Sequence, residues 1–505
     1  MGILSKRRDR RSELEEIDME LDAEVDGADE ATDSGRHRVL DDAAMREREL
    51  LERWKERRLP PKRNRRLDKY GWYQHRSEPG LTTTRQAEAL NLAISRRSDR
   101  HRGLITGVDR LTRSPVIADP FELYGADVTN INVSSNGDIG SGKSSMTSTA
   151  LARHVSVGRK VFCLDKKRQG GRGEYTKLAQ ALGAPSVQFA SNSGTRLNLL
   201  DPGIAAERRD VEADLAPASQ QTLIVAVLED AMRETMSEQE IAAVNRALVA
   251  VTKEAKGKGK AATVDLLAHR LLNPLHADLD EYGERFAERS GDWGLRPGLA
   301  LRRLIDGDLR GLLDGETTDD ITEALDHPFV HLDISGLPEN GPAIRVVMTV
   351  LNTLISNIAV QRSRQKEQTV QAIEEGWHVA EGSTGRLVMG NLKLSRGLGL
   401  STYTAFHRPS DLPEGSAAQS LMRENGIIFC YRQGRRRDAE EVCSLYNFPP
   451  GTEDILMSLP RGVCLAKIGS NAPLVMEHVR SPLEEYWTDT DDVIMGSRVA
   501  GRVAI

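Results

Sequence analysis

The sequence predicts an α/β fold with a largely parallel sheet and an inserted group of helices. Three observations support this prediction. Short apolar runs alternate with helical patterns from about residue 103, a glycine-rich segment at 137–145 stands between one such run and a helical pattern, and the interval 204–326 contains no convincing strand. Alternating strands and helices are typical of parallel sheets whose strands are joined by helical crossovers.

The apolar runs that we expect as strands are short, and most are separated by helical patterns. Together they supply enough strands for one large sheet. They lie at 128–135, 160–165, 186–190, 329–334, 369–374, 400–406, 426–431 and 462–468.

The interval 204–326 has the pattern of helices. Apolar residues recur three and four positions apart in "QTLIVAVLEDAMRETMSEQEIAAVNRALVAVTKEA", and Ser237 followed by Glu240 is a capping signal. We therefore expect a helical subdomain inserted into the α/β domain. The predicted order is an N-terminal extension (1–102), the first part of the core (103–203), the insertion (204–326), the second part of the core (327–488) and a tail (489–505).

Composition limits the class of protein. Hydrophobic residues make up 39% of the 505 residues, enough for a buried core, and the four cysteines contain no CxxC pair, which favours reduced thiols over disulfides or a zinc site. No apolar run approaches the roughly 18–20 residues of a membrane span, and the start of the sequence has no hydrophobic region of signal-peptide length. We therefore expect a cytoplasmic protein without a transmembrane segment, whose place at the inner face of a membrane would depend on a partner.

The N-terminal extension has a segregated charge within a net charge of -6. Residues 13–33 are acidic, whereas residues 46–76 are rich in Arg and Lys and include Trp54, Trp72 and two tyrosines. Two interpretations remain open. The extension is either a charged tail followed by a solvated helix, or an arm whose basic segment binds DNA or a partner protein.

The segment "GDIGSGKSS" has the spacing of a phosphate-binding loop. Backbone N–H groups of such a loop surround phosphates at the start of a helix, the lysine reaches the β- and γ-phosphates, and the serine hydroxyl binds Mg²⁺. We therefore expect ATP and Mg²⁺ as cofactors, with Ser144 as a metal ligand. The residues predicted to bind the nucleotide are Gly137, Asp138, Ile139, Gly140, Ser141, Gly142, Lys143, Ser144 and Ser145.

A pair of acidic residues follows the apolar run at 369–374. Glu374 stands where a carboxylate would hold Mg²⁺, and Glu375 stands where a carboxylate would polarise an attacking water. Paired carboxylates at a strand end are also common surface residues, but the loop upstream favours a catalytic role. The sequence therefore predicts nucleotide hydrolysis.

The segments "GDIGSGKSS", "DKKRQGGRGEY", "RLNLLDPG", "AIEEGW" and "LPRGVCLAKIG", in this order and spacing, resemble the ATPases of conjugation and type IV secretion, the VirB/TraC-type branch of the HerA–FtsK superfamily. The resemblance covers roughly residues 103–488. It implies a RecA-like motor domain with an inserted all-helical domain, which works as a homo-hexameric ring.

The resemblance also implies roles for individual residues. Glu375 matches the family's catalytic glutamate, and Arg396 lies where members place an arginine that reaches the neighbouring subunit's nucleotide. His407 occupies the position of a glutamine that senses the γ-phosphate. Four further matches are acidic residues after the second strand and an Asn-Pro-Leu-Asp element: Asp165, Glu174, Asn198 and Asp201.

The sequence departs from the family pattern at two site positions. Glu374 replaces an aspartate, which moves the carboxylate about 1.5 Å outward, and His407 replaces the glutamine. Both changes bear on the rate of hydrolysis more than on nucleotide binding.

Three functions follow from these observations. The first is an ATP-driven motor of a conjugation or type IV secretion-like system, which transfers DNA or protein or assembles the machine. The second is a soluble HerA-type DNA translocase, and the third is a nucleotide-binding scaffold with weakened hydrolysis.

Overall fold

The computed structural model describes residues 102–190, 193–201, 204, 220–275, 283–307, 309–338, 341–374, 395–408 and 422–488. The chain divides into two units, Met1–Asn91 and Leu92–Ile505, and every described residue belongs to the second. The acidic segment 13–33, the basic segment 46–76 and the tail 489–505 lie outside the described residues.

Eleven described strands form one sheet in the order β2-β1-β13-β12-β11-β3-β10-β9-β4-β8-β7, and β5 pairs with β6 in a separate hairpin. The strands are β1 (Ile105–Asp109), β2 (Pro115–Ile117), β3 (Val133–Asn136), β4 (Lys160–Asp165), β5 (Arg168–Gln169), β6 (Arg172–Gly173), β7 (Ser186–Gln188), β8 (Phe329–Asp333), β9 (Thr369–Ile373), β10 (Leu400–Phe406), β11 (Ile427–Cys430), β12 (Val463–Ile468) and β13 (Leu474–His478).

The sheet is parallel from β11 through β3, β10, β9, β4 and β8 to β7, and antiparallel from β11 through β12, β13 and β1 to β2. The predicted α/β class with a largely parallel sheet is therefore confirmed. Each of the eight predicted runs contains or overlaps a strand. The predicted run at 128–135 begins too early, because β3 starts only at Val133. At Asn132 the side-chain oxygen, not the backbone, accepts the hydrogen bond from the Thr402 amide (3.0 Å).

The parallel part of the sheet is buried on both faces. In β4, Phe162 and Leu164 belong to one hydrophobic core, whereas Val161 and Cys163 belong to the other. Successive side chains of a strand point to opposite faces, so a strand covered on both sides is apolar throughout. This is why the sequence shows continuous apolar runs here instead of alternation.

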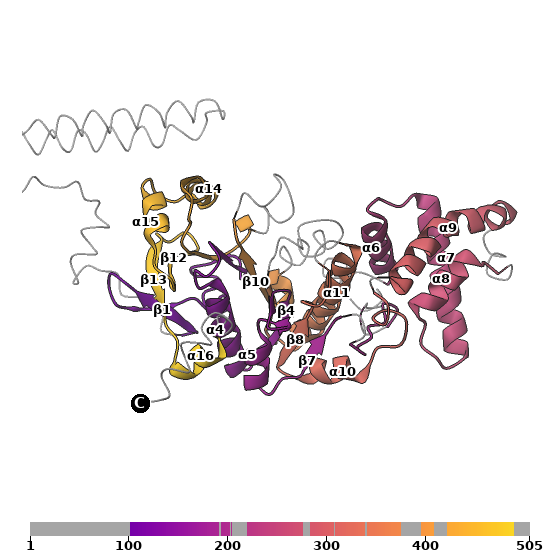
Figure 1. Ribbon diagram of the computed structural model, residues 1–505, viewed down its shortest axis with the longest axis horizontal. Coiled ribbons are helices and arrows are strands. Elements are labelled where there is room, and N and C mark those ends of the chain that lie inside the picture. The colour runs from indigo at the N-terminus through magenta and orange to yellow at the C-terminus, as the bar shows by residue number, and fades with distance from the viewer. Residues whose placement is uncertain are drawn as a thin grey trace, which may run out of the picture. The chain divides into compact units, whose positions relative to one another are not determined.

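Helices cover both faces (Figure 1). The core that contains α4 and α5 lies on one face, and the core that contains α11, α14 and the inserted helices lies on the other. The helices are α4 (Lys143–Ser156), α5 (Thr176–Ala181), α6 (Gln220–Met232), α7 (Glu238–Gly257), α8 (Val264–Leu272), α9 (Glu284–Asp306), α10 (Asp319–Asp326), α11 (Pro342–Arg364), α14 (Arg436–Tyr446), α15 (Thr452–Ser458) and α16 (Pro482–Trp487).

Between β7 and β8 the described residues contain helices α6 to α10, as the predicted insertion requires. The capping signal is confirmed, because the Ser237 hydroxyl accepts a bond from the Glu240 amide and the Glu240 carboxylate accepts one from the Ser237 amide. Helix α6 packs against α11, so the insertion shares its core with the sheet. The exact domain boundaries stay a prediction.

Among the described residues one helix, α11, is long and apolar enough to cross a membrane by length and composition, but 89% of its most apolar stretch is buried inside the protein. The expectation that no stretch reaches this length missed α11, because Thr and Asn residues interrupt its apolar run. Those polar side chains are bonded internally: Thr349 donates to Asp230 (3.0 Å) and Asn352 accepts from Gln371 (2.5 Å). Helix α11 therefore has the burial of a core helix.

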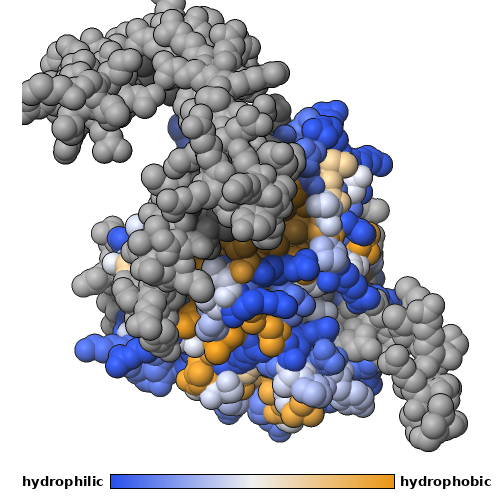
Figure 2. All heavy atoms as spheres, turned by 90° about the vertical axis from the view of Figure 1, so that its left-hand side faces the viewer, coloured by the Kyte–Doolittle hydropathy of each residue, from blue (hydrophilic) through white to orange (hydrophobic). Residues whose placement is uncertain are grey.

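Figure 2 views the molecule from the side on which Figure 1 draws β1, β13, α15 and α16. Hydrophobic side chains there stand in small groups between charged ones. Exposed apolar residues of these elements are Ile105, Ile455, Met457, Leu483 and Tyr486. Small apolar groups of this kind are usual on a protein surface.

Candidate functional site

The glycine-rich segment connects β3 to α4, which confirms the predicted order of strand, loop and helix. Two of its glycines have positive φ and close neighbours. A Cβ atom on Gly137 (φ 143°) would lie 2.7 Å from Cβ of Tyr431, and one on Gly142 (φ 113°) would lie 3.2 Å from Cα of Gly462. A larger residue would therefore change the path of the loop.

Lys143, the first residue of α4, lies folded inside this loop. Its ammonium donates to the carbonyl oxygens of Gly137 (2.5 Å) and Asp138 (2.9 Å). Burial lowers the pKa of Lys143 to about 8, partly offset by the nearby Glu374 carboxylate. The lysine is thus still mostly charged at neutral pH, and it stands at the positive end of a helix, where anions bind.

Glu374 faces the loop from the end of β9. The strands β9 and β3 are both neighbours of β10 and all three are parallel, so their carboxyl ends meet at one edge of the sheet. Glu374 is buried, and the Tyr175 hydroxyl donates to its carboxylate. Burial, followed by the charge of Glu174, raises the pKa of Glu374 to about 7.

Glu174 is a second buried carboxylate beside the loop. The Lys167 ammonium donates to it at 2.9 Å. Burial raises the pKa of Glu174, while Lys167 and the Ser144 hydroxyl act in the lowering direction. Two buried carboxylates next to one hydroxyl group supply oxygen ligands of the kind that Mg²⁺ prefers.

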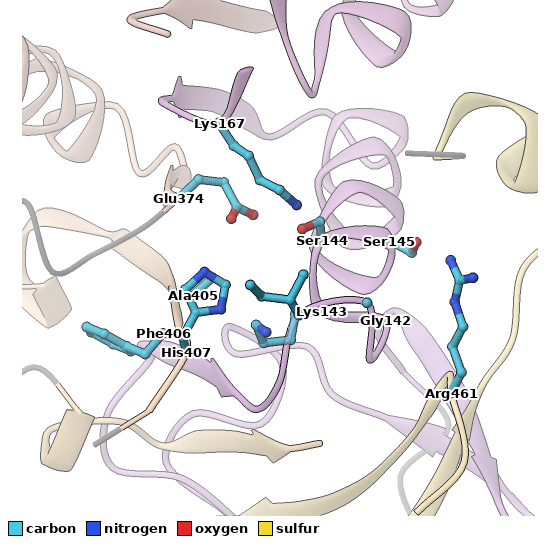
Figure 3. A pocket seen from close by; sticks show the side chains of 12 residues that line it. Gly142, Lys143, Ser144, Ser145, Lys167, Glu374, Ala405, Phe406, His407 and Arg461 are labelled. Carbon is cyan, nitrogen blue, oxygen red and sulfur yellow. The ribbon is translucent and has the colours of Figure 1, made fainter. Parts of the chain in front are cut away.

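A cavity of about 190 Å³ lies between the loop and Glu374 (Figure 3). This volume is smaller than the roughly 300–1,000 Å³ of sites that enclose a whole ligand. The cavity can therefore hold the phosphates of a nucleotide, but not its base and sugar as well. The residues that line it are Ile139, Gly140, Gly142, Lys143, Ser144, Ser145, Lys167, Glu374, Ala405, Phe406, His407 and Arg461.

No family model and no curated protein matches the sequence. Among solved structures, VirB4 of Thermoanaerobacter pseudethanolicus superposes with a TM-score of 0.59 at 22% identity, over 76% of this chain and 99% of that one. The fold is that of VirB4. The resemblance inferred from the sequence, with its RecA-like core and inserted helices, is thereby confirmed at the level of the fold.

Two further structures are similar to the chain. The plasmid coupling protein TrwB in complex with ADP and Mg²⁺ has a TM-score of 0.48 at 13% identity, over 76% of this chain and 92% of that one. The genome packaging NTPase B204 from Sulfolobus turreted icosahedral virus 2, in complex with AMP, has a TM-score of 0.32 at 8% identity, over 69% and 98%.

Within the VirB4-like fold, most of the predicted site residues come together. Three loop residues do not line the cavity but shape its wall. Gly137 and Asp138 use their carbonyl oxygens on Lys143, and the Ser141 hydroxyl donates to the Asp138 carbonyl at 2.7 Å. His407 follows β10, its side chain lines the cavity, and its carbonyl oxygen accepts from the Gly137 amide (3.2 Å).

Arg396 lies away from the cavity of its own chain. It is exposed in a helical turn before β10, whereas His407 follows the other end of that strand. The six steps from Leu400 to Phe406 span roughly 20 Å at about 3.3 Å per residue. Contact with nucleotide would therefore require the cavity of another subunit, which stays a prediction. Glu375 lies outside the described residues.

The residues matched only through the resemblance have structural contacts. Asp165 accepts from the Tyr175 amide (2.7 Å) and bonds His331 (3.0 Å), and so fixes the tyrosine that donates to Glu374. Asn198 donates to the Ala262 carbonyl (2.8 Å), and Asp201 accepts from Thr317 (2.8 Å). These bonds of Asn198 and Asp201 connect the end of the first core segment to the inserted helical region.

Three site residues were missed by the sequence analysis: Lys167, Tyr175 and Arg461. A usable signal existed for Lys167. It follows β4, the parallel neighbour of β9, so its side chain emerges at the same edge as Glu374. Arg461 precedes β12, which runs antiparallel to β11, and no rule of parallel sheets would place it here.

Replacing Glu374 by glutamine should change how stability depends on pH. A carboxyl whose pKa rises on folding from 4.5 to about 7 contributes its full stability below pH 4.5 and loses it as the pH rises through 7. The Glu374→Gln variant, whose amide oxygen can still accept from Tyr175, should be more stable than the wild type at pH 8, by about 1–3 kcal/mol, and this difference should shrink steadily as the pH falls to 5.

Urea unfolding of the nucleotide-free protein at pH 5, 6, 7 and 8 measures this difference. Glu440→Gln on α14, where the side chain is exposed, is the matched control and should follow the wild type at each pH. A stability difference that is the same at pH 5 and pH 8 would show that Glu374 is ionised throughout.

Proposed function

We propose that the protein is an ATP-hydrolysing motor of a conjugation or type IV secretion-like system. The observation that carries the proposal is the joint placement of Lys143, Ser144 and Glu374 around one cavity in a fold shared with VirB4. The lysine supplies positive charge for phosphates, and the strand-end carboxylate stands across from the loop, as hydrolysis of a polyphosphate requires.

Magnesium fits the donor set. The Ser144 hydroxyl and the Glu374 carboxylate both border the cavity, and hard oxygen ligands of this kind suit Mg²⁺ shared with phosphates. Bound there, Mg²⁺ would neutralise charge on the transferred phosphoryl group. Glu375 would orient the attacking water, His407 would donate a hydrogen bond to the terminal phosphate, and Arg396 would act on the nucleotide of a neighbouring subunit.

The proposed working form is a homo-hexameric ring in the cytoplasm, held at the inner face of the membrane by a partner of the secretion or conjugation machine. In such a ring, the exposed Arg396 of one subunit would face the cavity of the next subunit. Arg396 is too far along β10 to contact the nucleotide of its own chain, so its proposed role needs a neighbouring subunit. The work is the transfer of DNA or protein, or assembly of the machine.

Phosphate release measured over a range of protein concentrations, with Mg²⁺-ATP in excess, tests the proposal. If the ring is the active form, the specific activity should rise cooperatively with concentration. Constant specific activity would contradict the ring. Absence of phosphate release at every concentration, with and without DNA, would contradict the motor.

The basic segment 46–76 is the proposed site for DNA. Its deletion should weaken DNA binding and flatten the salt dependence, because each phosphate neutralised contributes about -0.9 to the slope of log K against log salt. Fluorescence anisotropy of a labelled duplex at several salt concentrations measures the slope. An unchanged slope together with lost recruitment to the membrane complex would assign the segment to a partner protein instead.

A further inference from the structure

Arg461 borders the phosphate cavity although it lies more than 300 residues from the loop in sequence. It sits in the turn between α15 and β12, and it is exposed, so it is accessible to a ligand. Arginine binds phosphates with a planar fork of donors, and its charge is retained at any physiological pH.

The turn that carries Arg461 is fixed to the phosphate loop by its backbone. The amide of Gly462 donates to the carbonyl of Ser141 at 2.9 Å, and the carbonyl of Gly462 accepts from the amide of His478 at 2.9 Å. A Cβ atom on Gly142 would lie 3.2 Å from Cα of Gly462, so the two backbones are in contact. The position of the Arg461 backbone relative to the loop is therefore set by the fold.

The other groups of the cavity indicate which way a bound polyphosphate would run. Glu374 and His407 lie on one side of Lys143 (Figure 3). In this view Arg461 lies on the opposite side of Lys143. In a loop of this type the lysine reaches the β- and γ-phosphates, and the metal and the hydrolytic carboxylate belong to the γ end. The Arg461 side therefore corresponds to the α end of the polyphosphate.

We infer that Arg461 binds the α-phosphate of the nucleotide. The inference rests on the proposed nucleotide binding and adds a contact at the end of the polyphosphate that remains after hydrolysis. Arg461 would hold ATP and ADP equally. It would thereby keep the product in the cavity and contribute uniform binding, which changes affinity without changing the rate of the chemical step.

Isothermal titration calorimetry with ADP and with a non-hydrolysable ATP analogue tests the inference. We expect Arg461→Ala to weaken both ligands by a similar factor, about tenfold or more, because one charge-assisted contact is lost from each. In phosphate release, the ATP concentration that gives the half-maximal rate should rise by a similar factor. Arg461→Lys keeps the charge without the fork and should lose less affinity.

Arg437→Ala is the matched control, since it removes an exposed arginine on α14 whose partner is Glu441 on the same helix. It should bind both ligands as the wild type does. Unchanged affinity of Arg461→Ala for ADP would overturn the inference, and so would a loss confined to the ATP analogue, which would place Arg461 on the γ-phosphate. Absence of nucleotide binding by the wild type would overturn the proposed function itself, a result distinct from both.

Discussion

Replacing Lys143 by alanine is expected to abolish nucleotide binding and hydrolysis together. The ammonium lies inside the loop, 2.5 Å and 2.9 Å from the carbonyl oxygens of Gly137 and Asp138, and the loop and helix residues that border the cavity beside it offer no second positive side chain. Affinity for ADP and for a non-hydrolysable ATP analogue should fall by about 100-fold or more, since charge-assisted bonds to phosphate are among the strongest in proteins.

Calorimetry and phosphate release measure the two losses. Lys258→Ala, which removes an exposed lysine at the end of α7, should behave as the wild type. Lys143→Arg keeps the positive charge. If it binds nucleotide better than Lys143→Ala, the loss in the alanine variant comes from the missing charge; if both fail equally, it comes from a changed loop. Normal affinity in a folded Lys143→Ala protein would show that the loop does not hold the nucleotide.

Replacing Glu375 by glutamine is expected to leave ATP bound and to stop turnover. The amide keeps the shape of the side chain but loses the carboxylate that would orient water, so the rate of phosphate release should fall by about 10²–10³ with affinity for the ATP analogue unchanged. Glu374→Gln should instead weaken the dependence of binding on Mg²⁺, because Glu374 borders the cavity beside Ser144.

Measuring both variants in one series settles the order of the acidic pair. Single-turnover phosphate release gives the chemical step, and titration with Mg²⁺ gives the metal dependence. If Glu374→Gln lost turnover while Glu375→Gln ran at the wild-type rate, the two carboxylates would have exchanged roles.

The sequence predicted the parallel core well because burial on both faces makes its strands continuously apolar. Strands β4 and β8 are examples, and they lie within a residue of the predicted ranges 160–165 and 329–334. The antiparallel extension was missed at β1, β2 and β13, whose residues are half-buried or exposed at many positions and carry no continuous pattern.

The site was predictable where its parts are local in sequence. The loop 137–145 and Glu374 follow directly from strands and carry recognisable spacing. The remaining contacts depend on folding at long range. The Tyr175 hydroxyl donates to Glu374 while Asp165 accepts from the Tyr175 amide, and Arg461 precedes Gly462, whose amide donates to the loop. No spacing along the chain encodes either contact.

The folded-back position of Lys143 has a consequence for protons. Burial holds the pKa of the Lys143 ammonium at about 8. A phosphate bound beside it would add negative charge and raise that pKa, so binding near pH 8 would draw a proton from solution. The carboxyl group of Glu374 has a pKa of about 7, and a metal ion bound there would displace its proton into solution. Loading this site is therefore coupled to proton exchange, with uptake at Lys143 and release at Glu374.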